Sequence, residues 1–70
     1  MTKAETERHL FNVYRDWLQE NRNTREKELM FWGYINHLPE FSQFGFGRNS
    51  GYQMTAIWVR EWNERLGTDS

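Results

Sequence analysis

The sequence predicts an all-α fold: a compact domain of three helices over residues 4–21, 24–38 and 52–66. Each of these segments repeats apolar side chains at intervals of three and four residues, which is typical of helices that bury one face. The 70 residues include no cysteine, so no disulfide holds the fold together. Four Trp, three Tyr and five Phe supply the bulky packing that so small a domain needs.

The first helix, over residues 4–21, has the clearest pattern. Its apolar side chains fall on one stripe: Leu10, Val13, Tyr14, Trp17 and Leu18. Polar residues occupy the opposite side, and Glu5 and Glu7 near the start suit the positive end of the helix dipole. We therefore expect this stripe to form part of the core.

The second helix is predicted over residues 24–38. Thr24 follows a polar break and suits an N-cap, and Pro39 should end the helix because proline disfavours helical backbone in the residue before it. Gly33 inside this helix costs about 1 kcal/mol relative to alanine. Close approach of another helix would offset that cost.

The apolar residues of this second helix do not form a single stripe. Phe31, Tyr34, Ile35 and Leu38 share one broad side, whereas Leu29, Met30 and Trp32 point elsewhere. A helix that is apolar most of the way round is either central in its domain or contacts a partner on a second face. We expect it to be the central helix.

Residues 39–51 form a segment rich in phenylalanine and glycine. We expect a loop, and the alternative is a short β-hairpin that pairs residues 44–48 with residues 52–56, which would make the fold class α+β. The third helix, over residues 52–66, begins at a capping box of Ser50 and Gln53. Its stripe comprises Trp58, Val59, Trp62 and Leu66, and Gly67 suits the position after the helix end. We assign Trp17 and Trp62 to the core.

Composition argues against several classes of function. Nine Lys and Arg against ten Asp and Glu give a net charge of −1, and neither histidine, His9 or His37, has metal-ligand spacing. No cysteine or G-x-S-x-G turn offers a nucleophile. We therefore expect neither an enzyme, nor a cofactor, nor a metal site.

The polar start of the chain does not resemble a signal peptide, and no stretch is apolar enough to span a bilayer. We therefore expect a cytoplasmic protein with no membrane contact. A 70-residue chain that begins with Met1 is expected to be complete, in the size range of small phage and plasmid accessory proteins.

The surplus of aromatic rings favours a protein-interaction module, because exposed aromatic patches mark binding surfaces. We expect a small adaptor, inhibitor or regulator that binds a protein partner and self-associates as a homodimer. The candidate partner-binding residues are Met30, Trp32, Phe44 and Phe46.

The alternative is a nucleic-acid accessory protein. Its candidate contacts are the basic residues Arg22, Arg25, Lys27 and Arg48, with Phe44 and Phe46 stacking on single-stranded bases. Glu20, Glu26 and Glu28 interleave with the basic residues, so the ordinary interpretation of this segment is a solvated turn.

Overall fold

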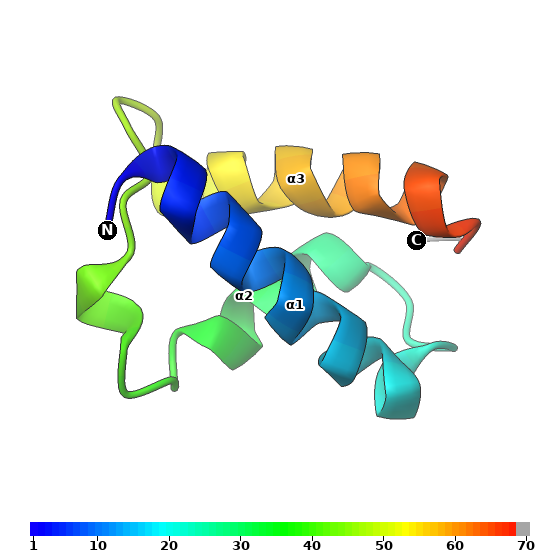
Figure 1. Ribbon diagram of the computed structural model, residues 1–70. Coiled ribbons are helices and arrows are strands. Elements are labelled where there is room, and N and C mark those ends of the chain that lie inside the picture. The colour runs from blue at the N-terminus through cyan, green and yellow to red at the C-terminus, as the bar shows by residue number, and fades with distance from the viewer. Residues whose placement is uncertain (69–70) are drawn as a thin grey trace.

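The computed structural model describes residues 1–68 and contains three α-helices and one turn of 3-10 helix. The elements are α1 (Lys3–Asn21), α2 (Lys27–Ile35), η1 (Phe41–Gln43) and α3 (Gly51–Leu66). Figure 1 shows α1 crossing in front of α2, with α3 along one side of both. The three-helix prediction is confirmed. The hairpin is wrong, because residues 44–56 contain no strand.

Helix α1 begins at a capping box. The Thr2 hydroxyl accepts from the Glu5 backbone N–H, and the Glu5 carboxylate accepts from the Thr2 backbone N–H. Leu10, Tyr14, Trp17 and Leu18 are buried, as the stripe predicts, and Val13 is half-buried.

Helix α2 is shorter than predicted. It begins at Lys27, and its N-cap is Glu26 in the left-handed region with φ of 54°, so Thr24 does not cap it. It ends at Ile35, and the next backbone bonds run from His37 N–H to the Tyr34 carbonyl and from Leu38 N–H to the Ile35 carbonyl. These tighter turns precede Pro39, which explains the early end.

Helix α3 fits its prediction closely. Of the predicted capping box, the structure shows the Ser50 half: its hydroxyl accepts from the Gln53 backbone N–H at 3.1 Å. Gly67 adopts φ of 68° and closes the helix. Trp58, Val59 and Trp62 are buried. Trp17 and Trp62 are 8% and 1% exposed, so their assignment to the core is confirmed.

The core is a set of stacked and edge-on rings shared by all three helices. Tyr14 of α1 meets Phe31 of α2 edge-on at 4.9 Å between centroids, and Trp62 of α3 lies 5.5 Å from Tyr14. Both α1 and α2 pack on α3, and α2 exposes one whole flank. The prediction that α2 is the central helix is therefore wrong.

The connection from α2 to α3 is tied to the start of α1 (Figure 1). The Gly45 backbone N–H donates to the buried Thr6 hydroxyl at 2.7 Å, and the amino group of Met1 donates to the Gln43 carbonyl at 2.8 Å. A Cβ at Gly45 would collide with the Met1 carbonyl oxygen, so this close approach requires glycine.

Candidate interaction surface

The flank of α2 that points away from the core carries three half-exposed apolar side chains. Leu29, Met30 and Tyr34 are 49%, 52% and 44% exposed, while Phe31 and Ile35 on the opposite flank are fully buried. Together with Gly33, these three residues form what we call the outer face of α2. Tyr34 was placed on the same broad side of the helix as Phe31, but it is not buried with it: its ring stacks beside Phe31 at 6.2 Å and remains open on one side.

Gly33 lies at the centre of the outer face. In the part of the chain that the structure describes, a Cβ placed there would meet no atom within 4 Å beyond its own helix backbone and chain neighbours. The expected approach of another helix to Gly33 therefore does not occur among residues 1–68. What remains is an open notch between Leu29, Met30 and Tyr34.

The outer face is also free of charge. No Asp, Glu, Lys or Arg occurs from Leu29 to His37. A half-exposed side chain of this size contributes on the order of 100 Å², so the three apolar residues expose roughly 300 Å², comparable to the largest apolar patch of a typical monomer. Apolar patches of this size are often functional.

Three of the four predicted partner-binding residues lie elsewhere. Trp32 packs edge-on against Phe41, Phe46 and Tyr52 at 5.6, 6.0 and 6.2 Å between centroids. Phe44 packs against Phe41 at 5.8 Å. We call these five rings the loop cluster. Trp32, Phe44 and Phe46 are each half-buried in it, so of the predicted set only Met30 belongs to the outer face.

The loop cluster exists because the segment after α2 folds back over the flank of Trp32. Gly51 permits this: a Cβ there would lie 2.6 Å from Cη2 of the Trp32 ring. Helical spacing shows that Trp32 points away from Phe31, but it gives no indication that a loop distant from Trp32 covers it.

Leu29, Gly33 and Tyr34 were missed as site residues. Placing them opposite Phe31 and Ile35 on a helix of the correct length would have indicated them.

The predicted basic residues do not form one surface. Arg22 and Arg25 are exposed, but Lys27 is 3% exposed and its Nζ donates to the Thr24 carbonyl at 3.0 Å. Residues 45–50, which include Arg48, lie at the opposite end of the molecule from the turn after α1 (Figure 1). The expectation that Lys27 contacts a phosphate from an open surface is wrong, because its side chain is buried.

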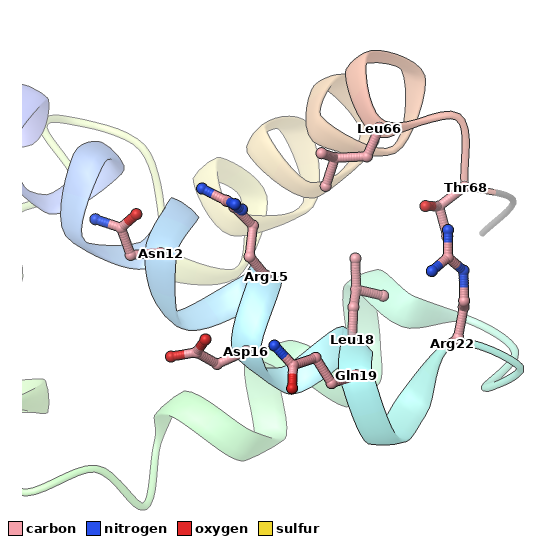
Figure 2. Close-up of a pocket in the computed structure, with 8 residues that line it drawn as sticks. All are labelled: Asn12, Arg15, Asp16, Leu18, Gln19, Arg22, Leu66 and Thr68. Carbon is pink, nitrogen blue, oxygen red and sulfur yellow. The ribbon is translucent and has the colours of Figure 1, made fainter.

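An open hollow of about 490 Å³ lies between the second half of α1 and the end of α3. Figure 2 shows Leu18 and Leu66 pointing toward one another across it and Arg22 reaching toward Thr68. Its lining comprises Asn12, Arg15, Asp16, Leu18, Gln19, Arg22, Leu66 and Thr68. Asp16 and the carbonyl end of α3 offset the positive charge of the two arginines, so the hollow does not favour an anion.

A second hollow of about 360 Å³ adjoins the first through Arg22 and Thr68. Arg25, Lys27 and Gly67 also line it. It too lies at the carboxyl end of α3, where the partial negative charge of the helix disfavours phosphate.

One buried polar contact joins α1 to α3. The Tyr14 hydroxyl donates to Oδ1 of Asn63, while Asn63 Nδ2 and Oε1 of nearby Glu28 are buried without a hydrogen-bond partner. Burial raises the pKa of Tyr14, and Glu28 adds to that effect. The hydroxyl therefore stays neutral and serves as a donor that fixes α1 against α3.

Residues 1–68 contain no grouping of three or more His, Cys, Asp or Glu side chains that would hold a metal ion. Within the same residues, every helix is too short or too polar to cross a bilayer. No protein-family model, curated protein or solved structure matches this chain.

Proposed function

We propose that this chain is a protein-interaction module, acting as a small adaptor, inhibitor or regulator, and that it binds its partner through the outer face of α2. The observation that carries this proposal is the outer face itself: three half-exposed apolar side chains around an open glycine notch, with no charge among them. Covering an exposed apolar surface with another molecule lowers the free energy, because it removes that surface from water.

The loop cluster supports this function indirectly. Its rings cover one side of Trp32 and hold the segment after α2 in place, so the end of α2 is fixed from both sides. A rigid helix presents its side chains in one arrangement, which lowers the entropy lost on binding. In this proposal, Phe44 and Phe46 do not contact the partner directly but hold the binding helix in place.

Photo-crosslinking tests the proposal directly. A benzoylphenylalanine replaces Met30 in one variant and Ile57 in a matched control. Each variant is irradiated as purified protein at about 1 mM and also in lysate of cells that express the native gene. Ile57 is 43% exposed but lies on α3 near exposed Gln53, Arg60 and Glu61. We expect a discrete adduct from position 30 only. The absence of any adduct at position 30, or equal adducts from both positions, would overturn the proposal.

The nucleic-acid alternative has weaker support, because residues 45–50, which include Arg48, lie at the opposite end of the molecule from the turn after α1, and because Lys27 is buried. It predicts binding to single- or double-stranded probes that weakens steeply with salt. Gel shifts at low salt decide between the two functions. Retarded bands that Arg22→Ala and Arg25→Ala abolish would favour the alternative.

A further inference from the structure

We propose that the partner of the outer face of α2 is a second copy of this chain, bound by an antiparallel pairing of the two α2 helices. This inference rests on the proposed function and names its partner. It follows from the order of residues on the outer face and from the charge of that face, and the area of the face sets the strength of the pairing.

The order of residues makes the outer face complementary to itself. In an antiparallel pair centred between positions 31 and 32, position 29 of one helix faces position 33 of the other, and position 30 faces position 34. Leu29 therefore lies over the partner's Gly33, and Met30 lies against the partner's Tyr34. A two-fold axis makes each contact twice, which is what a symmetric dimer requires.

Each of these contacts joins groups of suitable shape. Gly33 leaves an open notch into which a leucine side chain fits, because no atom of residues 1–68 outside its own helix and chain neighbours lies within 4 Å of the missing Cβ. Met30 is unbranched and flexible, and its sulfur makes favourable contacts with an aromatic ring such as that of Tyr34. Both the protruding side chain and the notch that receives it are present on one surface.

The charge of the face favours an identical partner. Two copies approach without like-charge repulsion, because no ionised side chain occurs from Leu29 to His37 and the net charge is only −1. Nothing on the face selects a partner of opposite charge. Antiparallel pairing also brings the positive end of one helix dipole toward the negative end of the other.

The area of the face sets the strength of the dimer. Roughly 300 Å² on each copy is well below the roughly 800 Å² per partner of a standard stable interface. The dimer is therefore weak and reversible, and the monomer dominates in dilute solution.

Sedimentation equilibrium from about 10 μM to about 1 mM protein measures this association. We expect the average mass of the wild type to rise toward twice the monomer mass. Leu29→Glu places a charge on the face and Gly33→Leu fills the notch, so both variants should remain monomeric. Ile57→Glu is the matched control and should behave as the wild type. Circular dichroism checks that each variant keeps its helices.

Cysteine crosslinking tests the antiparallel direction, since the chain has no cysteine of its own. A Leu29→Cys chain is mixed with a Gly33→Cys chain under oxidised glutathione. We expect the mixed disulfide to form faster than either symmetric one. A mixture of Ile57→Cys and Gly33→Cys chains should give no preference. Faster symmetric disulfides would overturn the antiparallel arrangement.

The outcomes separate this inference from the proposed function. A wild-type chain that stays monomeric up to about 1 mM, while position 30 crosslinks a different protein, overturns the second copy and leaves the interaction function standing. A monomeric chain that gives no adduct at position 30 overturns both. Equal loss of association in Leu29→Glu and Ile57→Glu would also contradict the assigned face.

Discussion

Replacing Gly33 by alanine should make the isolated monomer more stable. Gly33 lies inside α2 and has no positive φ, and its missing Cβ has open space in front of it. Alanine therefore fits without strain. It restricts the unfolded chain more than glycine does, which raises the free energy of unfolding by about 0.5–1 kcal/mol.

For a domain of this size, that gain corresponds to a rise in Tm of about 2–8 °C. Thermal unfolding followed by circular dichroism in dilute solution measures it without a contribution from dimer. Two other glycines serve as controls. Gly67→Ala should lower the stability by about 1 kcal/mol because Gly67 has φ of 68°. Gly51→Ala should also lower it, because the new Cβ would lie 2.6 Å from the Trp32 ring.

The reasoning fails if Gly33→Ala melts at or below the wild-type temperature. That result would mean that the space at Gly33 is filled within the monomer or that α2 is not a continuous helix there. A gain in stability would show that glycine at position 33 makes the monomer less stable than alanine would, which is the result expected if the glycine serves binding instead of folding.

Three further changes have defined expected results. Tyr14→Phe should lower the free energy of unfolding by about 1–3 kcal/mol, because it leaves the buried Asn63 amide with no partner, and Asn63→Leu in that background should recover part of the loss in urea unfolding. Trp32→Ala should cost about 1–3 kcal/mol and speed amide exchange across residues 41–46, because it empties the centre of the loop cluster. The Thr2 backbone N–H, and then the Thr2 hydroxyl, lower the pKa of Glu5 from its ordinary 4.5, so its contribution to stability is present above that pH and is lost as the pH falls through the folded-state value. Thermal melts of Glu5→Gln should accordingly lose part of the acid dependence seen in the wild type, and unchanged dependence would contradict that role.

Local sequence signals were sufficient for α1 and α3. Their stripes repeat regularly, and Ser50 and Gly67 mark the ends of α3 within one residue. These features depend only on neighbours along the chain. The buried Trp17 and Trp62 followed for the same reason.

Helix α2 shows where local signals fail. Its start depends on Glu26 in a left-handed conformation, which glutamate rarely adopts, so the sequence did not indicate it. A hydrogen bond from Lys27 Nζ to the Thr24 carbonyl accompanies that turn. Thr24 carries the correct side chain for a cap but lies outside the helix. The predicted helix was therefore too long at both ends.

The candidate site was predictable only in part. The sequence placed Met30 correctly on the outer face. Trp32 does not belong to that face, because it packs against Phe41 and Phe46, which follow Trp32 by nine and fourteen residues in the chain. Such contacts depend on the path of the chain through space. The role of Gly33 likewise required knowing that no helix of the described chain approaches it.

The most direct measurement is a series of ¹H–¹⁵N correlation spectra recorded on the wild type as its concentration is raised. Amide signals of Leu29, Met30, Gly33 and Tyr34 should shift progressively, while those around Ile57 stay in place. Shifts confined to residues 41–46 or to the hollow beside Arg22, with the signals of α2 unchanged, would contradict the assignment of the outer face as the binding surface.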